Sequence, residues 1–381
     1  MKKTIKIFGK ESIDQLPWPN TTRAKKIKKY IVPMIKNSPQ YYINNVKTTI
    51  QALLVDDLVL PITLNNEENG SSYVCSPHAH YIQYGRQEMT LIKNKAAKAF
   101  LESLLGMLGK FLKWGEIDKI IFVNNLLLPT NIHPALTQAQ IQAVTEGLIE
   151  RYPQHAVAFR SMNKIHPPSL LEHLKEEGFR LVISRLLYYT DTKTHEPFQS
   201  RMFKSDRKIL NQSLYKERRA EEIPQDAIPR IQELYHQLNI EKHSRCNPQF
   251  NENFVRLVMD SQWMTIKVLE QAGKIDAALG YFSEDKVMTS PFFGYDTSQP
   301  QDLGLYRQIS TILLLDAKRE GFFLNQSSGS GRYKTLRRAQ TTPEYIAVYH
   351  QHLPLRRRAP WTLLENVMNR FGKQFLDSYK P

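Results

Sequence analysis

The chain has 381 residues, of which 41% are hydrophobic and 10% aromatic, and this composition excludes a largely disordered protein. That length is enough for two ordinary domains, because single hydrophobic cores stop growing at roughly 250 residues. The formal charge of +15 predicts at least one anionic partner, whether nucleic acid, a nucleotide-bearing co-substrate or a membrane surface, and does not choose among them.

No stretch approaches the ~18 uninterrupted apolar residues of a membrane span. The two cysteines, Cys75 and Cys246, lie far apart in the sequence and lack the spacing of a metal cluster. Isolated thiols in a chain of this length fit a reducing compartment. We therefore expect a cytoplasmic protein without a membrane span, and the oligomeric state stays open.

The first half of the chain has the pattern of a mixed α/β unit. Two β-rich runs at 46–55 and 57–64 predict a hairpin, and further strands are expected at 72–75 and 81–84. Apolar residues recur at helical spacing over 93–112. After this helix we expect strands at 119–128, 155–161 and 180–189, which alternate with helices at 137–150 and 168–177.

The zone 191–222 is polar and rich in lysine and arginine, and it predicts a basic helix or linker between domains. We expect one domain over 1–195, the linker over 196–222, and a second domain over 223–381. Each domain is expected to be a mixed β-sheet flanked by helices.

The second half repeats the order of the first. We expect two helices at 228–239 and 250–260, a hairpin at 263–282 and a strand at 287–294. A helix at 303–320 that ends at Gly321, a strand at 322–326, a short helix at 331–339 and a strand at 345–352 are expected to follow. A basic turn and a helix follow from 354 onward.

The stretch from Pro291 to Lys334 carries groups suited to holding a phosphorylated donor beside an acceptor. The helix that starts at Gly304 offers free N–H groups and a positive dipole end to phosphate. A Ser-Ser-Gly-Ser-Gly loop at 327–331 can bring backbone N–H groups close to a ligand. The alternatives are an ordinary helix start and a flexible surface loop.

These motifs resemble the GNAT acyltransferase superfamily, and most closely its FemAB-like branch, in which two GNAT-type domains are joined in one chain. The resemblance is carried by Phe293-Gly-Tyr-Asp296, by Leu303-Gly-Leu-Tyr-Arg307, by the loop 325–334 and by Glu344-Tyr-Ile-Ala-Val-Tyr349. It implies two tandem GNAT-like domains and acyl transfer to an amine or hydroxyl of a small molecule or peptide. Acetyl-CoA or another acyl-CoA is the implied co-substrate, with no permanently bound cofactor.

One departure keeps the donor open. Most GNAT enzymes bind the coenzyme A pyrophosphate with a Gln/Arg-x-x-Gly-x-Gly/Ala turn, and no such turn precedes Leu303. The FemAB-like branch includes enzymes that take aminoacyl groups from charged tRNA. An acyl-carrier protein or an aminoacyl-tRNA is therefore an alternative donor.

The candidate site residues fall into three groups. The expected catalytic residues are Tyr295 and Asp296 as acid and base, Tyr333 as an alternative proton donor, and Lys334. Donor binding is expected from Gly304, Tyr306, Arg307, Asn325, Ser327, Ser328, Gly329 and Gly331. The acceptor pocket is expected to include His243, Ser244 and Asn247. No metal site is expected, since His78 and His80 have no third ligand in view.

Two rival functions stay open at this point. The basic runs 23–29, 204–219 and 356–358 would suit a non-catalytic nucleic-acid-binding protein, although they are not interleaved with aromatic residues. A degenerate GNAT scaffold within a biosynthetic complex would bind neither donor.

Overall fold

The computed structural model describes residues 4–66, 72–88 and 94–378, and the side chains among them up to residue 370. The chain falls into two compact units, and their bounds differ from the predicted domains. Unit 1 comprises Met1–Ser184, Ser244–Gln249 and Glu344–Phe375, and unit 2 comprises Arg185–His243, Phe250–Pro343 and Leu376–Pro381. The chain passes between the units inside two strands, so the segments that follow rejoin a unit that began much earlier in the sequence.

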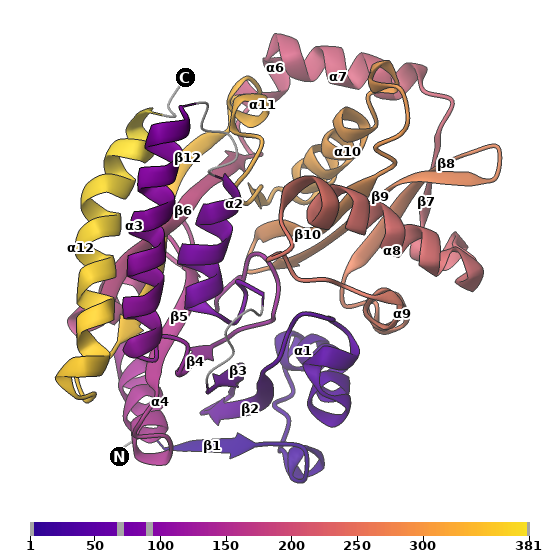
Figure 1. Cartoon of the computed structure of the whole chain (residues 1–381). Coiled ribbons are helices and arrows are strands. Elements are labelled where there is room, and N and C mark those ends of the chain that lie inside the picture. Colours follow the sequence, from indigo (N-terminus) through magenta and orange to yellow (C-terminus); the bar gives the residue numbers. More distant parts are fainter. Residues whose placement is uncertain (1–3, 67–71, 89–93, 379–381) are drawn as a thin grey trace. The chain divides into compact units, whose positions relative to one another are not determined.

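Unit 1 is a mixed sheet flanked by helices (Figure 1). Its elements are β1 (Ile5–Phe8), α1 (Thr22–Asn37), β2 (Thr49–Val55), β3 (Leu58–Asn65), α2 (Tyr84–Glu88), α3 (Lys95–Trp114), β4 (Ile120–Val123), α4 (Gln138–Arg151), β5 (Ala156–Met162), α5 (Leu170–Glu176) and α12 (Leu355–Ser378), with parts of β6 (Arg180–Asp191) and β12 (Gln340–Tyr349). The strand order is β1-β2-β3-β4-β5-β12. Only β4 and β5 pair in parallel within it, and α4 connects them.

Alternation along β4 divides the core of unit 1 into two layers. Ile121 and Val123 face a cluster that includes Ile141 and Val144 of α4. Ile120 and Phe122 face the opposite cluster, which includes Leu112 of α3 and Trp361 and Leu364 of α12. Side chains two residues apart on a strand share a face, so this short, wholly apolar strand is buried on both sides.

Unit 2 has a similar order of strands and helices, with a different strand at each edge of its sheet. Its elements are the rest of β6, α6 (Glu196–Gln199), α7 (Arg201–Gln212), β7 (Lys216–Arg219), α8 (Ile228–His236), α9 (Glu252–Ser261), β8 (Thr265–Gln271), β9 (Lys274–Glu284), β10 (Val287–Tyr295), α10 (Leu305–Glu320), β11 (Phe323–Asn325), α11 (Gly331–Thr335) and the start of β12. The order is β6-β11-β10-β9-β8-β7, with β10 and β11 parallel and the other pairs antiparallel. Each unit thus contains a hairpin followed by a strand, a crossover helix and a parallel strand, as predicted.

The helices α7 and α10 cover one face of the sheet of unit 2. Phe203 of α7 and Leu305 and Ile309 of α10 pack with Leu279 and Met288 from the strands. The opposite face carries a stack of aromatic rings, in which Tyr235 of α8 lies 4.8 Å from Phe292 of β10. The basic zone 196–222, predicted as a helix or linker, contains the helix α7, and the apolar side of α7 is part of this core.

Local signals explain where several elements begin and end. Thr137 and Gln140 form the capping box that starts α4, and Gly321 ends α10 in the left-handed conformation that favours glycine. The strand expected at 81–84 is wrong, because 79–83 is a helical turn that leads into α2. Ser76 causes this difference: its hydroxyl accepts the Ala79 N–H at 2.9 Å and starts the helix. The strand expected at 72–75 is likewise absent from the described part of that stretch, which forms turns.

No helix in the described part of the chain is long and apolar enough to cross a membrane.

Gly294 of β10 lies against the backbone of α8. A Cβ at this position would come within 2.5 Å of backbone atoms of Leu234 and Tyr235. Because backbone cannot swing aside as a flexible side chain does, we expect Gly294→Ala to lower the free energy of unfolding by about 1–3 kcal/mol. Urea denaturation measures the change.

The matched control is Gly106→Ala in α3, where the new Cβ would be 3.6 Å from its nearest neighbour. Helix propensity predicts that this variant keeps or gains stability. Equal stability of the two variants would contradict the close packing of β10 on α8.

Candidate functional site

The strands β10 and β11 part at one end of the sheet of unit 2. They pair only over Val287–Thr289 and Phe323–Asn325, and β11 ends there. After an irregularity between Thr289 and Phe292, β10 is paired over Phe292–Tyr295 with β9 alone among the described residues. A strand edge at the carboxyl end of a parallel pair, next to the start of the crossover helix, is where α/β proteins commonly bind ligands.

Four aromatic side chains join the three stretches singled out in the sequence. Tyr306, in the first turn of α10, has its ring 5.3 Å from Phe293 and 6.1 Å from Tyr295 of β10. On its other side the ring of Tyr333 of α11 lies 4.8 Å away. The structure therefore brings together the aromatic turn, the helix start and the end of the Ser-Gly loop.

The Ser-Gly loop is held on its inner side by β6. The Gln326 N–H donates to the Tyr188 carbonyl at 2.8 Å, and the Tyr188 N–H donates to the Ser327 carbonyl at 3.0 Å. Asn325 is buried, and its side-chain oxygen accepts the Ser327 N–H at 2.9 Å. The loop is thus an ordered turn and not a free linker.

Two glycines give this loop its shape. Gly329 has a φ of 77°, and nothing lies within 4 Å of the position that a Cβ would take, so this side of the loop is open. A Cβ on Gly331 would come within 2.1 Å of the Tyr188 hydroxyl. Ser328 directly precedes Gly329 and is partly buried. The predicted donor-binding residues of the loop therefore surround a backbone turn with one accessible face.

Lys334 is buried beneath the loop. Its Nζ donates to the carbonyls of Gln326 at 2.6 Å and Ser328 at 2.8 Å, and reaches that of Ser327 at 3.5 Å. Burial, with a smaller contribution from Arg185, lowers the pKa of Lys334 from 10.5 to about 7. The lysine was predicted as a catalytic residue, and its contacts make it a clamp that fixes the loop.

The depressed pKa of Lys334 gives a pH dependence of stability with a definite sign. Between about pH 7 and 10.5 the unfolded chain holds a proton on this amine that the folded chain has released. The free energy of unfolding contributed by Lys334 therefore rises with pH across this window. We expect the urea midpoint of the wild type to rise relative to that of Lys334→Met between pH 7 and 9.

Lys193→Met provides the control, because Lys193 is exposed. Its difference from the wild type should stay flat with pH. A flat difference for Lys334→Met as well would contradict the depressed pKa.

A buried carboxylate that the sequence reasoning missed organises the start of α10. Asp206 of α7 is 1% exposed and accepts hydrogen bonds from the guanidinium groups of Arg307 and Arg337. The Tyr333 hydroxyl donates to the same carboxylate at 3.3 Å, and the Arg337 guanidinium lies 3.4 Å above the Tyr333 ring. Arg307 also contacts Ser205, so its predicted phosphate charge is partly engaged within the protein.

The N-terminus of α10 has no side-chain cap. Gly304, the N-cap residue, is buried with a φ of 61°, and a Cβ there would come within 3.3 Å of Ile209 of α7. The first N–H groups of a helix have no partner inside the helix, so this end is suited to an anion or to water.

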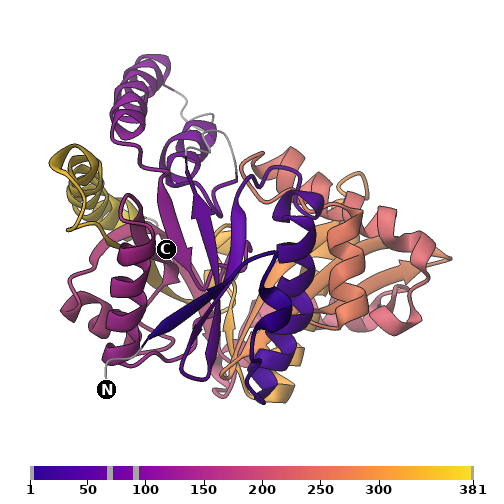
Figure 2. The same ribbon diagram turned by 90° about the horizontal axis from the view of Figure 1, so that it is seen from below.

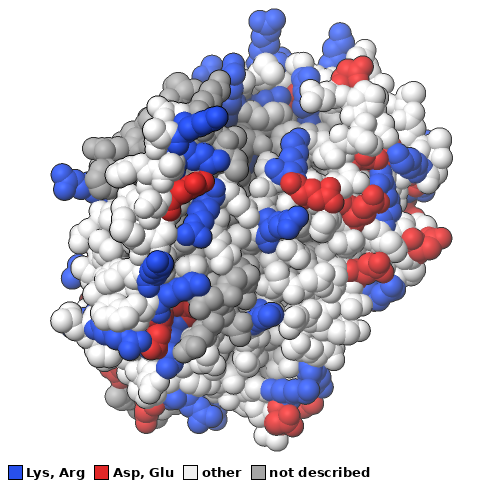
Figure 3. Space-filling view, viewed as in Figure 1, with Lys and Arg blue, Asp and Glu red and all other residues white. Residues whose placement is uncertain are grey.

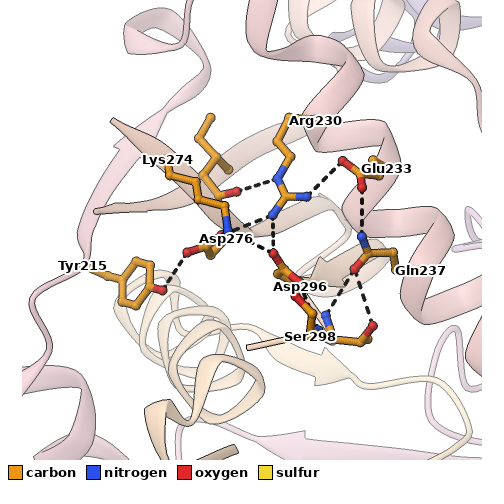
Figure 4. A network of polar contacts seen from close by, with 10 residues as sticks. Tyr215, Arg230, Glu233, Gln237, Lys274, Asp276, Asp296 and Ser298 are labelled. Carbon is orange, nitrogen blue, oxygen red and sulfur yellow. Dashed lines mark hydrogen bonds and ion pairs between the residues drawn. The ribbon is translucent and has the colours of Figure 1, made fainter. Parts of the chain in front are cut away.

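Asp296 lies in a network of charged side chains at the end of β10 (Figure 4). It accepts hydrogen bonds from Arg230 at 2.6 Å and Lys274 at 3.2 Å, and the same two cations contact Asp276. Burial raises the pKa of Asp296, but the hydrogen bonds from Ser298, Arg230 and Lys274 outweigh it and hold this pKa well below its usual range.

A general base works best with a pKa near the operating pH, so the lowered pKa gives the role of Asp296 as base no support, and that role stays a prediction. Its neighbour Tyr295 points elsewhere, with its hydroxyl 3.1 Å from the Nζ of Lys242.

The residues predicted for the acceptor pocket fall on both sides of a boundary between the two units. His243 is exposed at the end of the turn Gln237–His243 in unit 2, whereas Ser244 and Asn247 belong to unit 1. The Ser244 hydroxyl accepts the Cys246 N–H at 3.1 Å, and the Asn247 carbonyl accepts from Asn45 at 2.8 Å. The contact with Asn45 attaches 244–249 to the rest of unit 1, and a role in acceptor binding stays a prediction.

Unit 1 contains a cavity that is separate from the β10 edge. This cavity of about 480 Å³ is lined by residues of 38–49 together with Leu64 and Asn66. It shares no residue with the β10 edge, and its lining lacks the aromatic cluster and the ordered Ser-Gly turn. We therefore take the β10 edge as the candidate site.

Comparison with known protein families gives no match, and comparison with curated proteins gives none either. Among solved structures, the chain is similar to L-PGS from Bacillus licheniformis at 15% identity, over 60% of this chain and 76% of that chain, with a TM-score of 0.43. FemX is similar at 7% identity over 60% and 80% of the two chains, with a TM-score of 0.44. A tandem GNAT protein from the clavulanic acid biosynthesis pathway is similar at 7% identity over 91% and 98%, with a TM-score of 0.41.

These structures are of the kinds that the sequence resemblance named, a FemAB-like protein and a tandem GNAT protein among them. Their TM-scores lie below 0.5, so no argument about activity rests on them.

Proposed function

We propose that unit 2 is an acyltransferase domain, which moves an acyl or aminoacyl group to an amine or hydroxyl acceptor. The observation that supports this most is the edge of β10 beyond Thr289, which lies between the uncapped start of α10 and the ordered Ser-Gly loop. An extended chain with amide groups can hydrogen-bond to such an edge as an added strand. The reacting acyl group would then lie beside the aromatic cluster of Phe293, Tyr295, Tyr306 and Tyr333.

The charge around the site suits a phosphorylated donor. Arg307 and Arg337 share the single carboxylate of Asp206, so two positive charges against one negative leave a net charge of +1. The N–H groups at the start of α10 and in the loop 327–331 would add partial positive charge without side-chain interference. Acetyl-CoA or another acyl-CoA, an acyl-carrier protein and an aminoacyl-tRNA all carry phosphate, and all three remain donor candidates.

Acyl transfer also needs a proton for the leaving group. The acceptor nitrogen or oxygen attacks the acyl carbon, the bond to the donor sulfur or oxygen breaks, and the leaving group takes up a proton while the acceptor loses one. Burial raises the pKa of Tyr333, although Arg337 opposes this, so the phenol stays protonated at neutral pH. We assign Tyr333 to give this proton and to recover one from the acceptor.

The rival nucleic-acid-binding function has less support, because one arginine in each of two basic runs is engaged inside unit 1. Arg23 donates to the Val59 carbonyl at 2.7 Å and to Asn124 at 3.0 Å. Arg357 is buried and donates to backbone carbonyls at 115 and 154. Guanidinium groups that donate these hydrogen bonds within the protein are not available to bind phosphate.

The test is donor consumption in the presence of acceptors. The purified chain is incubated with acetyl-CoA, with longer acyl-CoA thioesters or with mixed aminoacyl-tRNA, together with a panel of amines and alcohols. We expect one donor class to be consumed in an acceptor-dependent way, with thiol release or deacylation as the readout. Donor consumption at the blank rate with every acceptor would contradict the transferase proposal, and the absence of binding to every donor would favour the degenerate scaffold.

A further inference from the structure

One helix of unit 1 exposes a row of large apolar side chains. Phe100, Leu104, Met107 and Trp114 of α3 are 69%, 48%, 60% and 53% exposed. Their spacing of three, four and seven residues sets them along one side of the helix, and Phe111, stacked on Trp114 at 5.6 Å, falls in the same row. We call Phe100, Leu104, Met107, Phe111 and Trp114 the α3 stripe. Exposed apolar residues that stand alone are ordinary, but a contiguous row marks an interaction surface.

The remainder of α3 is held firmly, so the stripe is not a consequence of a loose helix. Leu105, Leu108 and Leu112 pack in the core cluster that includes Trp361 and Leu364 of α12. Asn94 caps the first turn by accepting the Ala96 and Ala97 N–H groups at 3.0 and 3.1 Å. Figures 1 and 2 both show α3 at the periphery of unit 1. The inner side anchors the helix, and the stripe is apolar surface beyond what the core needs.

The charges of α3 are mostly positive. Its sequence contains Lys95, Lys98, Lys110 and Lys113 against Glu102 alone, which gives the helix a net charge of +3. The Arg356 guanidinium of α12 lies 5.6 Å from the ring of Trp114 at the end of the stripe. Figure 3 shows Lys and Arg side chains gathered over the region of α3, with few acidic ones.

This combination selects one kind of occupant. A second copy docking through the same face would bring together two helices that each carry a net charge of +3, and like charges repel. Nucleic acid would use the lysines but not Leu104 or Met107. A bilayer surface with anionic headgroups uses both, because the apolar side chains enter the boundary of the acyl chains while the lysines meet the headgroups. Tryptophan is also favoured at this interface.

We propose that α3 is a peripheral membrane-binding helix, which lies flat on a surface of anionic lipid. This inference is independent of the acyltransferase proposal, because it rests on residues of unit 1 only. In this proposal the α3 stripe inserts into the bilayer, and the lysines favour anionic lipid over neutral lipid.

The experiment is co-sedimentation of the full chain with vesicles of phosphatidylcholine alone or with a quarter phosphatidylglycerol. We expect binding to the anionic vesicles and little to the neutral ones. The variant with Phe100→Ser, Leu104→Ser and Met107→Ser is expected to lose at least about tenfold in partitioning. The control triple Tyr41→Ser, Leu214→Ser and Leu336→Ser removes side chains that are 53%, 77% and 49% exposed elsewhere, and should bind as the wild type does.

Trp114 supplies a second readout that does not depend on sedimentation. Brominated phosphatidylglycerol should quench part of the tryptophan emission, and Trp114→Phe should remove that part. No binding to anionic vesicles, equal binding to neutral ones, or equal loss in the two triple variants would overturn the proposal. Circular dichroism and the melting temperature confirm that each variant is folded.

Discussion

Replacing Asp206 with asparagine is expected to lower the free energy of unfolding by about 3–5 kcal/mol. The carboxylate is 1% exposed and is shared by Arg307 and Arg337. Among the described ion pairs, Asp206 is the only acidic partner of Arg337. Asparagine keeps the shape but leaves the buried Arg337 guanidinium and the partly exposed Arg307 guanidinium without their counter-charge. Chemical denaturation measures the loss.

The control for this variant is Glu270→Gln. Glu270 pairs with Arg218 at 2.8 Å, where both side chains are partly exposed, so water can replace the lost partner. We expect a loss below about 1 kcal/mol. If Asp206→Asn were as mild as this control, Asp206 would not be the organising charge of the α10 start.

The second large effect is expected at Lys334. Lys334→Met keeps the buried aliphatic stem but removes the Nζ that holds the carbonyls of Gln326 and Ser328. The Ser-Gly loop should then lose its fixed geometry, and a displacement of about 1 Å can cost about 100-fold in rate. We expect turnover of the donor to fall by at least that factor while the chain stays folded. Lys193→Met, at an exposed position, should keep full turnover.

Hydrogen exchange separates the two roles that Lys334 could have. As a clamp, its loss should speed amide exchange at 327–331. A loss of turnover with unchanged exchange would instead assign the amine to the chemistry itself. Normal turnover in Lys334→Met would remove the loop from the mechanism.

Local pattern was enough to predict most of the elements and the repeated order of hairpin, strand, helix and strand. The capping box at Thr137 and the glycine end of α10 at Gly321 are signals that depend only on neighbouring residues. Membership of a unit is different, because it depends on contacts between distant segments. Nothing local in 244–249 or in α12 indicates that they rejoin unit 1.

In the site, too, motifs made of neighbouring residues could be predicted, and contacts between residues far apart in the chain could not. The aromatic turn, the helix start and the loop 325–334 were found because each has a recognisable composition. Their partners could not be predicted from local composition: Asp296 contacts Arg230, 66 residues earlier in the chain. Asp206 was missed because it sits in a run of lysines and arginines, which reads as a solvated surface, and its partners Arg307 and Arg337 lie 101 and 131 residues away.

The central claim is that the β10 edge binds an acyl donor. Amide hydrogen exchange, measured with and without acetyl-CoA and separately with aminoacyl-tRNA, tests it most directly. We predict that one of these donors protects 290–296, 304–308 and 325–334 together. Protection confined to the cavity region 38–66 of unit 1, or no protection by either donor at saturating concentration, would contradict the account.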